Sequence, residues 1–262
     1  MQAVYCLSHT NANSQLKHIF IALTSLALCL FILTAASALE EPSEQYKNIA
    51  PLPGGGIALN SEGEPDGLGA MQINIPVAYT PGWGFANAGV YLGEHKEGTE
   101  ADNGTGIASL GFFGYPRVYM SGMQVSRVWE EAKVVSGQIF LMPETDKQPA
   151  FSLGVQDILM KEKHNRAIYG VFTKAVQLCG KDFFATAGYG GGRFLNRPFA
   201  GLSTPLNESI NLAAEWDGFQ LNAGIGWRPG GRDGKVTILG ARNFRTGWLI
   251  GIGAAFDFTP KD

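Results

Sequence analysis

The chain has 262 residues, enough for one large domain or two small ones, and 16% of them are charged. That fraction is below the roughly 25% of an average soluble domain, and the net charge of −3 is close to neutral. Composition and charge argue against a nucleic-acid-binding protein, because such proteins carry a surplus or a stripe of basic residues.

The N-terminal region has the composition of an export signal. Lys17 and His18 precede an apolar run over residues 19–36, and an A-S-A sequence ends at Ala38. A basic region, an apolar core and an A-x-A site are typical of a secretory signal peptide. We therefore expect residues 1–38 to direct export and to be removed. The alternative is an uncleaved transmembrane anchor, since the run is near the short end of the about 20 residues that span a bilayer.

After the signal, the pattern predicts a leader, one large β domain and a tail. Residues 39–69 are rich in Pro, Gly and Glu and have little hydrophobic period, which indicates a flexible or plug-like leader. Residues 70–258 consist of short alternating runs separated by turn residues, and residues 259–262 form a short tail. No other apolar run approaches the length of a membrane-spanning helix, so any membrane residence of the mature chain is expected to use strands.

The predicted strands are about 12 in number, within a range of about 10 to 14. Most have the roughly 9 to 11 residues that a tilted strand needs to cross a bilayer. A further short piece over 196–203 is either strand or loop. The expected strands are 70–79, 83–93, 105–113, 117–126, 134–142, 149–157, 167–176, 182–192, 210–216, 219–228, 235–243 and 248–258.

The clearest period of two lies in the C-terminal third. Over 219–228 the residues Phe219, Leu221, Ala223, Ile225 and Trp227 alternate with Gln220, Asn222, Gly224, Gly226 and Arg228. Residues 248–258 and 210–216 alternate in the same way. Each strand therefore has one apolar face and one small or polar face.

Period two alone fits a soluble β-sandwich as well as a membrane barrel, and three features favour the barrel. Aromatic residues gather at strand ends, as in the girdles of outer-membrane barrels. The other face is mostly Gly, Ala, Ser and Asn, which suits a narrow lumen better than a solvated sheet. The signal peptide also delivers the chain to the periplasm, where such barrels assemble. The predicted fold is an all-β, antiparallel transmembrane barrel in the bacterial outer membrane, with membrane lipid as its surroundings.

The stretch from Phe151 to Phe258 carries a family resemblance. Its runs FSLGVQDIL, AIYGVFTKAV, FFATAGYGGGRF, RPFAGLSTPL, INLAAEWDGFQLNAGIGWRP and GWLIGIGAAFDF are similar in order to the YjbH-type outer-membrane proteins linked to exopolysaccharide production. The resemblance covers roughly the last 110 residues of a chain that is shorter than those proteins. It departs from the common barrel pattern after Phe258, where Thr-Pro-Lys-Asp follows. The resemblance implies polysaccharide or an export machinery as partner, and it carries over no catalytic residue.

Four charged residues form the candidate site. Glu215, Arg228, Arg242 and Asp257 are expected on the inward faces of the last strands. Such a cluster in the lumen either gates and selects polar solutes or fills a narrow lumen as a structural ion-pair set, since buried charges are usually paired.

The sequence offers no catalytic, cofactor-binding or metal-binding constellation. The mature histidines are His95 and His164, both in charged, loop-like segments, and neither neighbourhood suits a nucleophile with a His base. Cys179 is the mature chain's single cysteine, so an internal disulfide is excluded. No Cys/His/Asp cluster has metal spacing. We therefore expect a non-enzymatic transport or structural barrel. An outer-membrane enzyme acting on lipid or glycan, and a secreted soluble β-rich binding protein, are the alternatives.

Overall fold

The structure is a computed structural model that describes residues 52–94, 104–126, 133–159, 166–245 and 247–258. The predicted signal peptide, residues 39–51 of the predicted leader and the tail 259–262 lie outside the described residues. The strands are β1 (Phe85–Gly93), β2 (Gly104–Phe112), β3 (Val118–Ser126), β4 (Lys133–Met142), β5 (Ala150–Gln156), β6 (Ala167–Leu178), β7 (Lys181–Gly190), β8 (Arg197–Asn207), β9 (Ile210–Trp216), β10 (Leu221–Trp227), β11 (Val236–Asn243) and β12 (Gly247–Asp257).

These strands close into a barrel in which each strand pairs with its sequence neighbours and β12 pairs with β1. All the pairings are antiparallel, and they include the closing pair from Phe85 opposite Asp257 to Gly93 opposite Leu249. The expected all-β antiparallel barrel of about 12 strands is therefore confirmed. Short 3-10 turns, Gly192–Phe194 and Gly231–Asp233, lie in the β7–β8 and β10–β11 connections.

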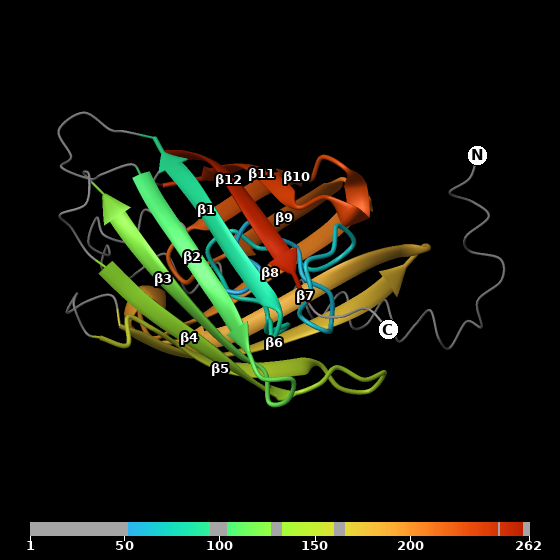
Figure 1. Cartoon of the computed structure of the whole chain (residues 1–262), viewed down its shortest axis with the longest axis horizontal. Coiled ribbons are helices and arrows are strands. Elements are labelled where there is room, and N and C mark those ends of the chain that lie inside the picture. Colours follow the sequence, from blue (N-terminus) through green and yellow to red (C-terminus); the bar gives the residue numbers. More distant parts are fainter. Residues whose placement is uncertain (1–51, 95–103, 127–132, 160–165, 246, 259–262) are drawn as a thin grey trace. The chain divides into compact units, whose positions relative to one another are not determined.

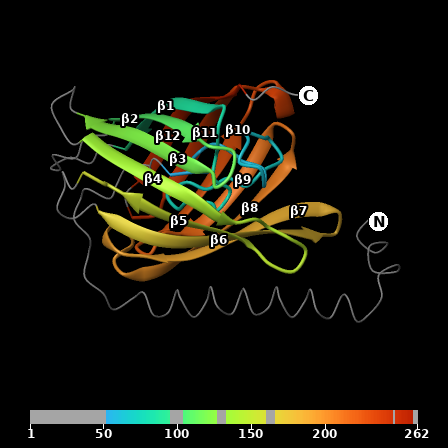
Figure 2. The ribbon, with the colours of Figure 1, turned by 60° about the horizontal axis from the view of Figure 1, so that its bottom comes forward.

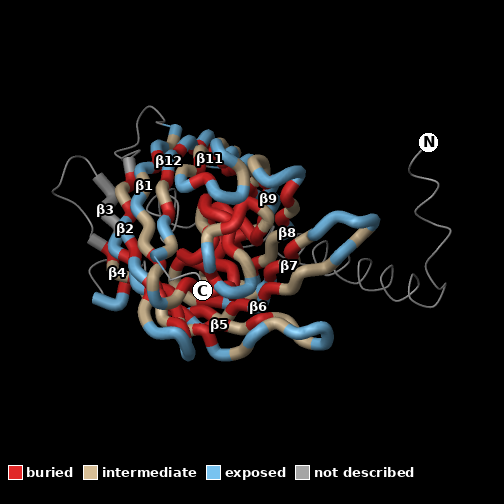
Figure 3. Tube along the Cα trace, turned by 45° about the vertical axis from the view of Figure 1, so that its right-hand side comes forward, coloured by how far each residue is buried: buried red, intermediate tan, exposed pale blue. Residues whose placement is uncertain are grey.

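Residues 52–84 are called the plug segment: most of them are buried inside the barrel, and their last residues, including the exposed Trp83, lead out of the lumen to β1. Figures 1 and 2 show this blue-to-cyan stretch within the ring of strands, and Figure 3 shows the buried tube that fills the ring. The strand expected over 70–79 is wrong, because this stretch belongs to the plug segment and the first barrel strand begins at Phe85. The short piece expected over 196–203 is instead the full strand β8.

The strands of the barrel have one face that points into the lumen and is buried, and one face that points outward and is exposed. On β10, Leu221, Ile225 and Trp227 point outward and are exposed, whereas Asn222 is fully buried. On β12, Trp248, Ile250 and Ile252 are exposed, whereas Leu249 and Ala255 are buried. The predicted inside and outside of these strands are confirmed. The core of the protein is thus the lumen, where the plug segment packs against the inward side chains.

Aromatic side chains in the wall pack over glycines of neighbouring strands. A Cβ added at Gly251 would lie 2.0 Å from Cδ1 of Tyr91, and one added at Gly154 would lie 2.2 Å from Cζ of Tyr169. Both tyrosines are almost fully buried. The glycines on the inward face therefore make room for large rings between wall and plug.

We expect Gly154→Val to lower the free energy of unfolding by about 1–3 kcal/mol, because the Tyr169 ring has to leave its site. Urea unfolding of the purified variants measures this effect. Gly122→Val is the matched control, since a Cβ at Gly122 on β3 meets nothing within 4 Å. Equal unfolding midpoints for the two variants would contradict the packing role of Gly154.

Candidate functional site: the plugged lumen

The plug segment is held mainly through its backbone. Wall side chains donate to or accept from its amide and carbonyl groups between Ser61 and Ala78. Apolar plug residues fill the remaining space, and Ile73, Ile75 and Val77 have no exposed surface. Because a buried backbone group without a partner is costly, these bonds fix the path of the plug through the lumen.

Glu215 on β9 makes the most concentrated contact with the plug. Its Oε2 accepts from the amide of Ile73 at 2.8 Å, and its Oε1 accepts from the amide of Asn74 at 2.6 Å. Nδ2 of Asn222 on β10 donates to the same Oε1 at 3.0 Å and also to Asp217 at 2.9 Å. The carboxylate is 2% exposed, so it acts as a buried clamp on two successive plug amides.

A second set of contacts surrounds Ala78 and comes from neighbouring strands. The amide of Ala78 donates to Oγ1 of Thr173 at 2.8 Å, and its carbonyl accepts from Oγ of Ser152 at 2.7 Å. Nε2 of Gln138 donates to the carbonyl of Val77 at 2.9 Å, and Oε1 of Gln138 accepts from the Tyr169 hydroxyl at 2.9 Å. These contacts hold the plug to β4, β5 and β6.

Arginines hold the plug at the end of the barrel where β1 begins and β12 ends, which we call the terminal end. Arg117, in the β2–β3 connection, pairs with Glu62 at 3.2 Å and donates to the carbonyl of Ser61 at 2.9 Å. Arg232, in the β10–β11 connection, pairs with Asp66 at 2.9 Å. Burial lowers the pKa of Arg117, with Glu62 acting in the opposite direction, whereas the hydrogen bond to Asp66 raises the pKa of Arg232.

The buried polar side chains between plug and wall are mostly uncharged, although Glu215, Asp217 and Arg228 are buried there as well. A gap lined by Met71, Asn211 and Gly226, among others, has a volume of about 10 Å³, which is close to the minimum for one water molecule. Within the part of the chain that the structure describes, several buried wall atoms have no hydrogen-bond partner, among them Oγ1 of Thr105 and Oγ of Ser136. Hydroxyl and amide groups dominate the polar part of the wall, as in Ser121, Gln138, Ser152, Thr173, Thr186, Ser203, Asn211, Gln220, Asn222 and Asn243.

The four predicted site residues do not come together as one cluster. Glu215 lies opposite Asn222, whereas Arg228 follows the far end of β10, about 20 Å away at about 3.3 Å per residue. Arg228 is inward, and its Nη2 donates to the carbonyl of Pro65 at 3.2 Å. Glu215 and Arg228 thus each contact the plug, but they do so near opposite ends of the barrel.

The placement expected for Arg242 is wrong. On β11 the buried positions are Thr237, Leu239, Ala241 and Asn243, so Arg242 faces outward. There it pairs with Glu94 at 3.0 Å and lies over the Trp248 ring at 5.2 Å. Asp257, at the terminal end of β12, is partly buried opposite Phe85 and far along the strand from Arg242, whose partner on β12 is Trp248.

The sequence does not favour the histidines or the cysteine of the predicted mature chain as catalytic groups. His95 and His164 lie outside the described residues, and Cys179 is exposed in the β6–β7 turn. Within the described ranges, no group of three or more His, Cys, Asp and Glu is arranged to hold a metal ion. Among those same residues, no helix is both long and apolar enough to cross a membrane.

Sequence reasoning missed most of the plug contacts. No local motif surrounds these residues, so none of them was predicted as a site residue: Arg117, Gln138, Ser152 and Thr173. Their inward position follows from alternation within their strands or from their place at a strand end. Their partners, however, lie 55 to 95 residues away along the chain.

Comparison with known proteins adds no family assignment: neither a protein-family model nor a curated protein matches this sequence.

Proposed function

We propose that the chain is an outer-membrane β-barrel whose lumen is closed by its own plug segment, with a structural or gated-transport role. The observation that carries the proposal is the outer surface of the closed barrel. Exposed aliphatic side chains cover its middle, and exposed aromatic side chains lie at both ends. The aliphatic band includes Val90, Leu110, Leu153, Leu202, Leu212, Ile225 and Ile252. The aromatic belts contain Trp83, Phe113, Tyr115, Trp227 and Phe258 at the terminal end, and Tyr189, Phe244 and Trp248 at the opposite end.

The spacing of these belts supports a membrane of ordinary thickness. Trp248 and Phe258 are ten positions apart on one chain segment that includes β12. At about 3.3 Å per residue and a tilt of about 40°, the separation across the membrane is about 25 Å, which matches the apolar band of outer-membrane barrels. Outward-facing charges lie toward the ends, where Lys174 pairs with Glu144 and Arg242 pairs with Glu94. The terminal end would then face the periplasm, as in barrels with an even number of strands.

A charge placed in the middle of the band tests the membrane assignment. Ile225 is 45% exposed on β10. In a bilayer, Ile225→Arg is expected to lower the free energy of unfolding by about 2–4 kcal/mol. On a soluble protein, an exposed substitution usually changes it by about 0.5 kcal/mol or less. Urea unfolding in lipid vesicles measures the difference, with Ile225→Leu as control. Equal free energies of unfolding for Ile225→Arg and Ile225→Leu would favour the alternative of a secreted soluble protein.

The resemblance noted for residues 151–258 suggests a solute for a gated barrel. We propose a supporting role in exopolysaccharide export, with polysaccharide or an export machinery as partner. The neutral hydroxyl and amide side chains of the lumen wall are chemically suited to sugars, which offer hydroxyl groups of their own. The plug segment occupies the space that such a polymer would need, so the role requires movement of the plug. Polysaccharide secretion by cells that lack the protein would be unchanged if this role were wrong.

A further inference from the structure

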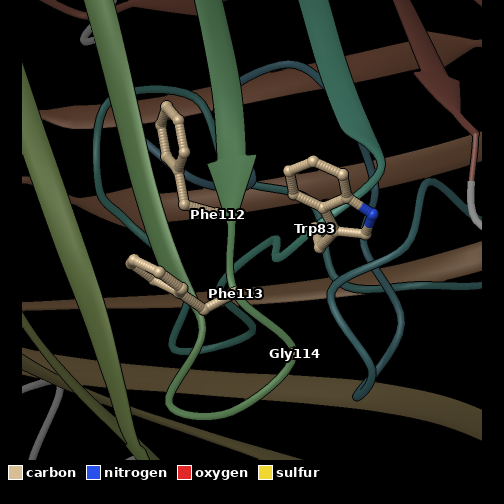
Figure 4. A pocket seen from close by; sticks show the side chains of 4 residues that line it. All are labelled: Trp83, Phe112, Phe113 and Gly114. Atoms are coloured by element: carbon tan, nitrogen blue, oxygen red, sulfur yellow. The ribbon is translucent and has the colours of Figure 1, made fainter.

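An apolar pocket lies on the barrel surface at the terminal end, outside the plugged lumen. Its volume is about 440 Å³, and it is lined by Trp83, Phe112, Phe113 and Gly114. Figure 4 shows the Trp83 ring on one side of an open space and the two phenylalanine rings on the other. Trp83 is 70% and Phe113 is 64% exposed, which is similar to other aromatic side chains of the outer surface such as Phe258 at 69%.

The backbone around the pocket holds these rings apart. Phe113 has a φ of 62°, a left-handed conformation that is rare for a bulky residue and occurs mainly where the surrounding structure enforces it. Its carbonyl accepts from the Trp83 amide at 3.0 Å. A Cβ at Gly111 would lie 1.9 Å from the carbonyl oxygen of Gly82, so the end of the plug segment packs directly on the end of β2. The pocket is thus formed where the chain leaves the lumen to enter β1.

The lining selects for a hydrocarbon ligand. Its surface is almost entirely carbon, and none of the four lining residues carries a charge. Pockets for polar small molecules of this size include a few convergent polar groups that fix the orientation of the ligand. Phe112 is also an outward residue of β2, in line with Leu110 of the aliphatic band, so the pocket continues the surface that the proposed function places against lipid.

We propose that this pocket binds one acyl chain of a membrane phospholipid at the terminal end of the barrel. The proposal rests on the membrane location given under the proposed function. It goes beyond the proposed function, because it assigns a defined binding site to one acyl chain, whereas the proposed function requires only general contact with the bilayer. Trp83 and Phe113 would flank the chain, and the open space beside Gly114 would receive it.

Quenching of tryptophan fluorescence by brominated lipid tests the site. The full-length protein is reconstituted in phosphatidylethanolamine–phosphatidylglycerol vesicles with and without bromine on the acyl chains. The difference between the native protein and Trp83→Phe isolates the Trp83 signal. We expect strong quenching of Trp83, reduced at least about twofold in Gly114→Leu, because the new side chain takes the volume that the acyl chain needs.

The control is Gly122→Leu on β3, where an added Cβ likewise meets nothing within 4 Å. We expect it to leave the quenching of Trp83 unchanged, and heat-modifiable migration on a gel confirms that each variant is folded. Two results would overturn the lipid site but not the membrane location. One is equal quenching of Trp83 in Gly114→Leu and in the native protein. The other is no quenching of Trp83 while Trp227 and Trp248 are quenched. Absence of quenching at Trp83, Trp227 and Trp248, three of the five tryptophans of the chain, would overturn the membrane location itself. A change of oligomeric state in Gly114→Leu with unchanged quenching would assign the pocket to a second copy of the chain and would also overturn the proposal.

Discussion

Replacing residues 54–82 by a short Gly-Ser linker is expected to open the barrel to ions and small sugars. We expect its conductance in planar bilayers to exceed that of the native protein by about tenfold or more, because a 12-stranded wall is wider than the eight-stranded barrels that side chains alone fill. In the native protein the plug occupies this space, and the gap beside Met71 is only about 10 Å³. The native barrel should therefore be nearly silent in the same measurement.

The same linker inserted in the exposed β6–β7 turn, between Cys179 and Gly180, is the control, and its conductance should match that of the native protein. A folded deletion variant that conducts no better than the native barrel would show that the wall closes the lumen by itself. If the deletion prevents folding, the whole-chain variant Glu215→Ala answers the same question, because it loosens the plug and leaves every residue of the plug in place.

Glu215→Ala is expected to lower the free energy of unfolding by roughly 3 kcal/mol. The amides of Ile73 and Asn74 and Nδ2 of Asn222 would lose their acceptor in a lumen with little room for water. Each hydrogen bond to a charged group contributes about 1.5–3 kcal/mol, and relief of the buried charge offsets part of the loss. Hydrogen exchange gives the local readout: the amides of Ile73 and Asn74 should exchange much faster in the variant.

Glu208→Ala removes an exposed carboxylate from the β8–β9 turn and serves as the control. We expect it to change stability by about 0.5 kcal/mol or less. Unaltered exchange at Ile73 and Asn74 in Glu215→Ala would mean that packing, and not the carboxylate, holds this part of the plug.

The barrel strands could be predicted because each presents one face to the lumen and one to its surroundings. This sorting appears directly as a period of two in β9, β10 and β12. Strand β8 was harder to predict, since Pro198 and Pro205 interrupt its pattern. The structure accommodates Pro205 next to a register irregularity between Pro205 and Asn207, so the strand continues to its full length.

The plug could not be separated from the barrel by the same reasoning. Met71, Ile73, Ile75 and Val77 alternate with other residues as a barrel strand would, and an extended chain has this period wherever it lies. The difference is that Gln72 is also fully buried, so both faces of the segment are enclosed. Burial of both faces is a property of the closed barrel, and a single segment of sequence does not reveal it.

The candidate site was predictable only in part, for a related reason. The inward position of Glu215 follows from its neighbours Leu212 and Trp216, which face outward. Its partners are backbone amides about 140 residues earlier in the chain, and backbone groups leave no trace in a sequence pattern. Arg242 was assigned to the wrong face because both faces of β11 mix apolar and polar residues. The sequence of this strand therefore does not indicate which of its faces points inward.

The proposed outer-membrane location of the plugged barrel is tested most directly by fractionation of bacteria that produce the full-length chain. Membranes are separated on a sucrose gradient, and the outer-membrane fraction is washed with alkaline carbonate, which removes peripheral proteins. We predict that the protein migrates with the outer membrane, remains there after the wash and is extracted by detergent. Recovery of the protein in the soluble periplasm without detergent would contradict the account.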